Sequence, residues 1–556
     1  MKKIIFNSGF INNYLLMLLI ILCSVTTYSQ TEYLLNINRL SLPFKNDGVI
    51  ADVTNSTGGR LDDKHFLFSA GFLLAGKFGN EIFANGVASA SRIADYLPGN
   101  VDSNSTNPNY KIYVILKDPA FNSSWMDYRN AVVRGADFYD GNGDGIYNPI
   151  DLNGNGQWDI NEDRPDILGD ITTWCVLNDG KPANQRRFSD VNPLGIEIHQ
   201  TLWAYTTNNP NDARSVTFFV RYKLINKGKV AQTLDSVYFA GWSDTDLGAV
   251  SDAYLDDLAG CDTIHNSGYI YNDGDDPDWG VNPPAHFIKV LQGPYAYIPG
   301  ITFIDNNFNG EYDDGIDTPL DTAYNHRGNV LGKTVIPGAR NIGMYAYVNT
   351  LSSNPVQGDP GDKIRAWNYL QGKNLTGQRY MYSGDPVTGI GWINNFPSDQ
   401  RQIVSTGPFK LRVGKPVNII LAHIVGRGNS ALNSITVSRA YSSAIEQFLR
   451  NNFTNIPLSV ENNQSTQIVN DYELYQNYPN PFNPQTKIKF SVPEFSFVKL
   501  SVFDIIGKEV RTILNDWKTA GEYVVEFDGS ELPSGVYFYQ IKAGNYVETK
   551  KMILIK

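Results

Sequence analysis

Short runs in which apolar and polar residues alternate fill the C-terminal part of this 556-residue chain and restrict it to antiparallel β-structure. Alternation with a period of two puts the apolar side chains of a strand on one face, which must then be covered. Turn signals such as Ile506-Gly507-Lys508 separate the runs. The runs cover residues 487–492, 498–503, 509–514, 523–527, 536–541 and 546–555. This spacing predicts a small antiparallel sandwich of six or seven strands within residues 471–556.

The composition extends the β prediction to the rest of the chain. Its 49 Gly, 28 Pro, 32 Tyr and 28 Phe, against 6 Met, favour strands joined by turns over a helical bundle. Hydrophobic residues make up 42% and charged residues 19%, which excludes a wholly disordered chain because a core can form. The formal charge of −11 gives no reason to expect a nucleic-acid partner.

Two pairs of strand-like runs indicate how residues 30–453 are built. Residues 216–226 and 234–241 flank an Asn-Lys-Gly turn, and residues 402–413 and 416–425 flank a Gly-Lys turn. The pattern predicts multidomain immunoglobulin-like β-sandwiches. The chain is divided into a signal peptide (1–29), a β-rich region (30–210), a β-sandwich region with a packing helix over residues 431–451 (211–453), a polar linker (454–470) and the C-terminal domain (471–556).

The first 29 residues have the pattern of a secretory signal peptide. Lys2 and Lys3 precede an apolar run over residues 14–25, and small and polar residues follow. This run is too short for a membrane-spanning helix, which needs about 20 residues, so we expect no transmembrane anchor in the mature chain. Cleavage near residue 29 leaves Cys175 and Cys261, and the sequence is compatible with one disulfide bond or with two buried free thiols.

Four short motifs occur in order in the C-terminal domain. They are YQNYPNPFNP at residues 475–484, VFDIIG at 502–507, LPSGVY at 532–537 and KMILIK at 551–556. Together they closely resemble the C-terminal (type A) sorting domain of type IX secretion cargo. The resemblance implies a partner, the type IX secretion machinery, and a secreted or cell-surface location. In that family the domain is usually removed, and the cargo is released or attached to surface lipopolysaccharide.

Asp, Asn and Gly alternate in three segments at the spacing of a calcium-binding loop. Such a loop wraps one ion with oxygen ligands at positions 1, 3, 5, 7, 9 and 12, and it turns at a glycine in position 6. Position 7 contributes its carbonyl oxygen. The candidate Ca2+ ligands are Asp140, Asn142, Asp144, Ile146, Asn148 and Asp151 in the first loop; Asp151, Asn153, Asn155, Gln157, Asp159 and Glu162 in the second; and Asp305, Asn307, Asn309, Glu311, Asp313 and Asp317 in the third.

The flanks of these loops favour structural calcium over a regulatory switch. Gly135 lies shortly before the first loop and Pro165 shortly after the second, so the two long helices of an EF-hand are not predicted. In the third loop Ile316 occupies position 12, so Asp317 or Asp314 has to supply the carboxylate. An aromatic residue stands at position 8 of every loop. Locally the loops resemble the calcium repeats of dockerins and of thrombospondin type 3 segments.

A further acidic segment, residues 244–262, holds six aspartates and neither Lys nor Arg. Three interpretations stay open: a solvated loop, another cation site, or a catalytic carboxylate pair that uses Asp244, Asp246 or Asp257. A glycosidase needs two carboxyl groups about 5–10 Å apart in a cleft. An ion site instead needs oxygens that converge on one point.

Signatures of other enzymes are missing from the sequence. The six histidines include no His-x-x-x-His pair, and no G-x-S-x-G or G-x-G-x-x-G motif occurs. We therefore assign no catalytic residue and expect a calcium-stabilised β protein with a binding or structural role. The alternatives are a secreted carbohydrate-active hydrolase and a glycan-binding module. The second of these needs aromatic residues aligned on a flat face, for which the candidates are Trp158, Trp279 and Trp392.

Overall fold

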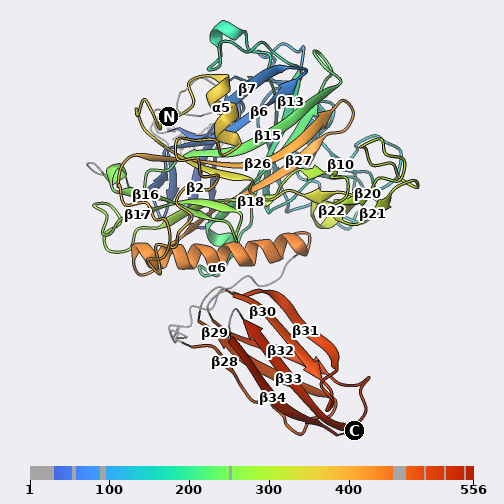
Figure 1. Cartoon of the computed structure of the whole chain (residues 1–556). Coiled ribbons are helices and arrows are strands. Elements are labelled where there is room, and N and C mark those ends of the chain that lie inside the picture. The colour runs from blue at the N-terminus through green and yellow to red at the C-terminus, as the bar shows by residue number, and fades with distance from the viewer. Residues whose placement is uncertain are drawn as a thin grey trace, which may run out of the picture. The chain divides into compact units, whose positions relative to one another are not determined.

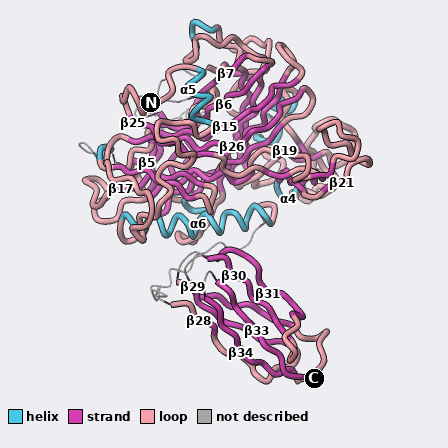
Figure 2. Tube along the Cα trace, viewed as in Figure 1, coloured by secondary structure: helices cyan, strands magenta, loops and turns pink. Residues whose placement is uncertain are grey.

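The computed structural model describes residues 31–52, 58–87, 95–248, 253–454, 471–493, 496–518, 521–543 and 546–555, and every count below refers to these ranges. The predicted signal peptide and nearly all of the predicted linker lie outside them. The chain divides into two units, residues 1–460 and 461–556 (Figure 1). Both consist mainly of β-strands, as predicted (Figure 2).

Ten strands of the first unit form one antiparallel sheet, here called sheet A. At its centre β15 (Thr233–Asp244) pairs with β6 (Ser69–Phe78) on one side and with β26 (Gln400–Arg412) on the other. Along most of these strands residues on both faces are buried, so burial does not alternate, although polar residues such as Gln402, Ser405 and Thr406 are among those buried. The other strands of sheet A are β1 (Glu32–Ile37), β2 (Leu40–Lys45), β3 (Ile50–Asp52), β4 (Gly59–Leu61), β5 (Lys64–Leu67), β7 (Glu81–Val87) and β25 (Ala346–Leu351).

Nine further strands form sheet B. Its central pair is β14 (Thr217–Asn226) with β27 (Val417–Gly426), and β13 (Ile196–Ala204) and β18 (Ala285–Gln292) border this pair. The remaining strands are β8 (Leu97–Pro98), β9 (Tyr113–Leu116), β12 (Ile171–Asn178), β16 (Asp257–Asp262) and β17 (Ser267–Asn272).

Sheets A and B pack against each other around one hydrophobic core. A Cβ atom at Gly241 of β15 would collide with Leu421 of β27, and one at Gly268 of β17 would collide with Tyr347 of β25. Glycine at these two positions therefore lets the backbones of the two sheets come close. The result is a large β-sandwich. With ten and nine strands it exceeds the seven to nine strands of an immunoglobulin domain, so the immunoglobulin-like label stays a prediction.

Both predicted strand pairs are present, but the two members of each pair enter different sheets. The chain leaves β14 in sheet B, turns at Gly228 with φ +72°, and enters β15 in sheet A. In the same way it leaves β26 in sheet A and enters β27 in sheet B. Strands from both sides of residue 210 thus share each sheet, and the regions 30–210 and 211–453 form a single unit.

The predicted packing helix is α6 (Ala431–Arg450), which lies across β17, β18 and β27 (Figure 1). Ser430 caps its first turn by accepting a hydrogen bond from the N–H of Asn433. A shorter helix, α5 (Lys363–Leu370), packs on sheet A. The remaining helical turns are α2 (Ser123–Asp127), α3 (Arg129–Val132), α4 (Gly328–Leu331) and the 3-10 turns η2 (Ala183–Gln185), η3 (Ala213–Val216) and η4 (Ala253–Leu255).

Short strand pairs frame the Asp/Asn/Gly segments. β10 (Phe138–Tyr139) and β11 (Arg164–Pro165) pair directly before the first loop and after the second. β20 (Phe303–Ile304) and β21 (Thr318–Pro319) do the same for the third loop, and they lie at one end of the first unit (Figure 1). The other short pairs are β19 (Tyr295–Ala296) with β24 (Arg340–Asn341) and β22 (Thr322–His326) with β23 (Lys333–Pro337).

The second unit is a two-sheet sandwich of seven strands, as the alternation predicts. One sheet contains β28 (Glu473–Leu474), β29 (Gln485–Val492) and β32 (Gly521–Asp528). The other contains β30 (Ser496–Phe503), β31 (Glu509–Lys518), β33 (Gly535–Ala543) and β34 (Tyr546–Leu554). Between them lies a separate core that includes Phe490, Leu500 and Tyr539. The six predicted runs are all strands, and only the two-residue β28 lies outside them.

Cys175 and Cys261 are buried free thiols, which decides between the two alternatives left by the sequence. Burial raises the pKa of Cys175 to about 12, so little thiolate forms at neutral pH.

We expect a thiol reagent such as DTNB to react with neither cysteine in the native mature chain and with both in guanidinium chloride. Reaction with fewer than two thiols in denaturant without a reducing agent would instead show a disulfide bond.

Candidate functional site

The three predicted calcium loops share one hydrogen-bond pattern. Each begins with an aspartate whose carboxylate accepts a hydrogen bond from the N–H of the glycine at position 6. The donor–acceptor distances are 2.8 Å for Gly145 to Asp140, 2.7 Å for Gly156 to Asp151 and 2.7 Å for Gly310 to Asp305. The side-chain oxygens at positions 3 and 5 accept from the N–H two residues further on. These bonds fold alternate oxygen side chains back along the turn, as a calcium loop requires.

Each loop is closed by one carboxylate that accepts hydrogen bonds from the N–H groups of positions 2 and 9. The three are Asp163, which accepts from Gly141 (3.0 Å) and Asn148 (2.6 Å); Glu162, which accepts from Leu152 (2.6 Å) and Asp159 (2.8 Å); and Asp317, which accepts from Asn306 (2.8 Å) and Asp313 (2.8 Å). Glu162 holds the place expected for position 12. In the third loop Asp317, rather than Asp314, holds it.

In the first loop this place belongs to Asp163, which the sequence did not single out. Asp151, the predicted twelfth residue of the first loop, bonds to Gly154, Asn155 and Gly156 of the second loop. Asp163 lies beyond the whole second loop, so no single-loop spacing finds it. The first loop thus closes only through the structure of its successor.

Position 9 distinguishes the loops. The carboxylates of Asp159 and Asp313 accept hydrogen bonds from the amides at positions 3 and 5 of their own loops, so these side chains meet. Asn148 instead accepts from Arg129 at 2.6 Å. At position 7 the side chain of Glu311 forms ion pairs with Lys410 and Arg412, which leaves its carbonyl as the oxygen for an ion.

Hydrogen bonds favour the ionised form of two exposed loop carboxylates. The N–H of Gly156 lowers the pKa of Asp151, and the amide of Asn307 lowers that of Asp313. Ionised carboxylates and amide or carbonyl oxygens are the ligands that calcium prefers.

The aromatic residues at position 8 attach the loops to the first unit. Tyr147 packs edge-to-face on Tyr128 and Phe138, and its hydroxyl donates to the carbonyl of Trp125 at 3.0 Å. Tyr312 stacks on Tyr297 with ring centroids 5.2 Å apart. Trp158 packs on Tyr139, lies near the guanidinium of Arg164, and donates to the carbonyl of Glu162 at 2.9 Å. The recurrence of aromatic residues is therefore explained by anchoring.

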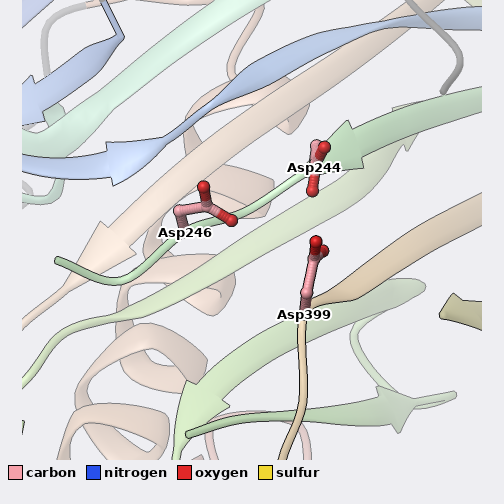
Figure 3. A group of neighbouring side chains, drawn as sticks. All are labelled: Asp244, Asp246 and Asp399. Carbon is pink, nitrogen blue, oxygen red and sulfur yellow. The ribbon is translucent and has the colours of Figure 1, made fainter. Parts of the chain in front are cut away.

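A second acidic site lies at the end of sheet A. Asp244 is the last residue of β15, Asp246 follows two residues later, and Asp399 immediately precedes β26. One carboxylate oxygen from each residue lies within 4.8 Å of the others. Figure 3 shows Asp244 and Asp399 facing each other, with the carboxyl group of Asp246 turned toward them. We call these three residues the aspartate cluster.

The sequence named Asp244 and Asp246 but not Asp399, which no local pattern connects to them. Asp257, the third predicted carboxylate, is 0% exposed, and its Oδ2 accepts from the N–H of Leu247 at 3.4 Å. It lies next to the aspartate cluster without belonging to it.

Arg401 of β26 is the cation that contacts the aspartate cluster. Its guanidinium lies 3.0 Å from Oδ2 of Asp244, 3.7 Å from Oδ2 of Asp399 and 2.6 Å from Oδ2 of Asp359. Arg401 and Asp359 also line a cleft of about 530 Å3. Burial, with the charge of Asp399, raises the pKa of Asp246 to about 7, and burial with the charge of Asp246 raises that of Asp244.

The three tryptophans named for glycan binding do not present a common open face. Trp279 is only 2% exposed and lies beneath Lys64 and Arg427. Trp158 is used in anchoring the second loop, as described above. Trp392 is 37% exposed and packs on Tyr382.

The motif at residues 475–484 packs and hydrogen-bonds against the last two strands of the second unit, β33 and β34. Tyr539 of β33 donates its hydroxyl to the carbonyl of Tyr475 and accepts from the N–H of Asn477, both at 2.8 Å. Phe482 is buried, and its N–H donates to the carbonyl of Ile553 at 2.9 Å. The motif thus joins the N-terminal residues of this domain to its last two strands through hydrogen bonds.

Comparisons with solved structures gave matches of low sequence identity. The chain is similar, at 6% identity, to a solved polysaccharide lyase, with a TM-score of 0.21 over 65% of this chain and 34% of the other. It is also similar, at 9% identity, to dimeric latent PorU from Porphyromonas gingivalis, with a TM-score of 0.14 over 69% of this chain and 31% of the other. The chain therefore spans about a third of the length of each. Curated proteins gave no match.

The family comparison is specific for the second unit. Residues 476–556 match the model of the secretion system C-terminal sorting domain. Among the described residues, no helix combines the length and the apolar character needed to cross a membrane. Residues 476–556 are thus a secretion system C-terminal sorting domain, and the chain is cargo of the type IX secretion system, secreted or displayed on the cell surface.

Proposed function

We propose that the first unit is a calcium-stabilised surface or secreted module with a binding or structural role. The observation that supports this proposal most is the identical hydrogen-bond pattern of the three Asp/Asn/Gly loops. Each loop gathers several oxygen side chains around one turn. In the third loop, Glu311 forms ion pairs with Lys410 and Arg412. In the first loop, Asn148 accepts a hydrogen bond from Arg129. Structural calcium would neutralise the remaining carboxylates and fix the loops. Surface glycans or lipopolysaccharide are the proposed contacts of such a module.

A binding or structural role is preferred over hydrolysis. The carboxylates of Asp244 and Asp246 converge with Asp399 on one point, which fits an ion site better than a pair of catalytic groups held apart by a substrate. Asp257 is completely buried. A screen of polysaccharides for both binding and hydrolysis tests this choice, and turnover that is lost in Asp246→Asn would establish the hydrolase instead.

Removal of calcium is expected to lower the melting temperature of the mature chain by several degrees. An ion at 100 times its Kd stabilises a fold by about 2.7 kcal/mol per site. About 2–4 °C of melting temperature corresponds to each kcal/mol in a domain of 150–250 residues, with smaller shifts in larger units. Differential scanning calorimetry with EDTA, and then with calcium restored, measures the effect. An identical melting curve in both conditions would contradict the proposal.

Single variants assign the ions to loops. We expect Asp163→Asn to remove one equivalent of bound calcium from the first loop and Asp151→Ala to remove one from the second, as measured by isothermal titration. Asp275→Asn, which changes an exposed aspartate outside the loops, is the matched control and is expected to keep every equivalent. A loss of two equivalents in Asp151→Ala with none in Asp163→Asn would show that Asp151 serves both loops.

A further inference from the structure

The aspartate cluster brings together oxygen atoms from two distant parts of the chain. Asp244 and Asp246 end a central strand of sheet A, and Asp399 lies more than 150 residues later, at the start of the strand paired with it. The register sets this meeting, because Asp244 is opposite Arg401, two residues after Asp399. The three carboxylates therefore meet through the pairing of β15 with β26.

Two oxygens of the cluster have no hydrogen-bond donor. Arg401 faces Oδ2 of Asp244 and Oδ2 of Asp399. Oδ1 of each is inaccessible to solvent and has no partner among the described residues. The side chain of Asp244 is 7% exposed, so this oxygen belongs to a carboxylate more than nine-tenths buried. A buried carboxylate oxygen without a donor costs free energy unless a cation or another ligand reaches it.

The charges around the cluster also favour a bound cation. Asp244, Asp399 and Asp359 share the guanidinium of Arg401, whose shortest contact is with Asp359. The closest arginine is thus engaged mainly outside the cluster. Next to it, Asp257 is wholly buried and its Oδ1 also has no partner. Within the described part of the chain, the ion pairs of the cluster are those of Asp244 and Asp399 with Arg401, which is one cation for three carboxyl groups.

We propose that Asp244, Asp246 and Asp399 bind one divalent cation, at a site distinct from the three loops. The donors are oxygens only, which selects a hard cation, and three carboxylates that can bind through one or both oxygens suit Ca2+ better than the strict octahedron of Mg2+. Asp246 and Asp399 are half-buried, which leaves a route for the ion.

The bound ion would join the end of β15 to the start of β26. It would also hold residues 245–248, the segment that leads from Asp244 through Asp246 toward Asp257. At this position the ion acts between strands of sheet A, whereas each loop ion acts within one turn. Its effect is therefore expected on the stability of the whole first unit.

Calcium stoichiometry of the mature full-length chain tests the proposal. We expect Asp246→Asn and Asp399→Asn each to bind one equivalent less than the wild type after EDTA treatment and titration with CaCl2. Asp275→Asn is expected to bind the full number. The loop variants Asp163→Asn and Asp151→Ala lose their own equivalents independently, so failure at the aspartate cluster is distinguishable from failure of the proposed loop sites.

A second measurement on the unaltered chain covers the case in which a cluster variant does not fold. Crystals soaked with Tb3+, a calcium substitute with strong anomalous scattering, are expected to show a peak between the three carboxylates. Full calcium stoichiometry in both folded cluster variants would overturn the proposal. So would a Tb3+ map with peaks at the loops and none between Asp244, Asp246 and Asp399.

Discussion

Deletion of residues 472–556 is expected to stop delivery of the first unit to the cell surface while its fold is kept. The sorting domain has its own core and its own two sheets, and the first unit likewise has a core of its own. The truncated chain should therefore fold and then remain in the periplasm. Cell fractionation in a bacterium with type IX secretion measures this, and a near-complete loss from the surface and the medium is expected.

Two tyrosine variants test whether export requires a correctly folded sorting domain or only the presence of its sequence. Tyr539→Phe removes the hydroxyl that bonds to both Tyr475 and Asn477, at a cost of about 1–3 kcal/mol for the buried groups left without partners. Tyr478→Phe changes an exposed residue of the same motif and is the matched control. We expect reduced export for the first variant only.

Delivery of the truncated chain in normal amounts would contradict the role of the sorting domain. Aggregation of the truncated chain would be a different failure, and circular dichroism together with the melting temperature of the purified module identifies it. Equal export of both tyrosine variants would show that the secretion machinery exports the domain even without the hydrogen bonds of the Tyr539 hydroxyl.

The second unit could be predicted from the sequence almost strand by strand. Its strands have one face in the core and one in solvent, so burial alternates along β29 and β33 with the period of the strand. The central strands of the first unit are covered on both faces, and the alternation disappears. There the sequence predicts strands but not their partners, because a short turn such as the one at Gly228 can lead into the same sheet or into the opposite one.

In the candidate sites, too, residues close together in the sequence could be predicted, whereas residues brought in from distant parts of the chain could not. Positions 1, 3, 5 and 6 of each loop are local, and their hydrogen bonds follow the predicted spacing. Asp163 and Asp399 complete their sites from a distance that only the fold sets. For the closing carboxylate of the third loop, the sequence left two candidates, Asp314 and Asp317. The hydrogen bond from the N–H of Asn306 identifies Asp317.

Below pH 6.5, two buried histidines are expected to make a destabilising contribution to the first unit. His286 of β18 and His423 of β27 lie on neighbouring strands, with His286 Nε2 and His423 Nδ1 3.1 Å apart. Thr245 contacts Nδ1 of His286 at 2.8 Å, and Phe218 stacks on His423. Burial lowers the pKa of His423 to about 3 and holds that of His286 well below its usual value.

The sign follows from the difference between the folded and unfolded states. In the unfolded chain a histidine takes up a proton near pH 6.5, whereas in the folded chain His423 stays neutral down to about pH 3. The stability that this histidine contributes is therefore complete above pH 6.5 and falls as the pH decreases between these values. Asp246, whose pKa burial raises to about 7, contributes with the opposite sign in the same range, so only a comparison of variants isolates the histidine. The slope is about 1.4 kcal/mol per pH unit for each histidine that remains neutral. Burial would raise the pKa of Glu197, but its hydrogen bond with His199 lowers it to about 2, so the loss of its contribution to stability begins only below about pH 4.5, the lower end of the measured range.

Urea unfolding of the calcium-loaded module between pH 7.5 and 4.5 measures this slope in the wild type and in two variants. His423→Asn keeps an acceptor near His286 but removes one titrating ring, so its free energy of unfolding should vary less with pH by about 1.4 kcal/mol per unit. Phe218→Leu removes the ring stacked on His423 and no titrating group, so it should lower stability equally at every pH. Because all other ionisable groups are shared, only the difference in slope reports the histidine. Parallel pH profiles for the wild type and His423→Asn would mean that His423 is protonated in the folded chain as readily as in the unfolded one.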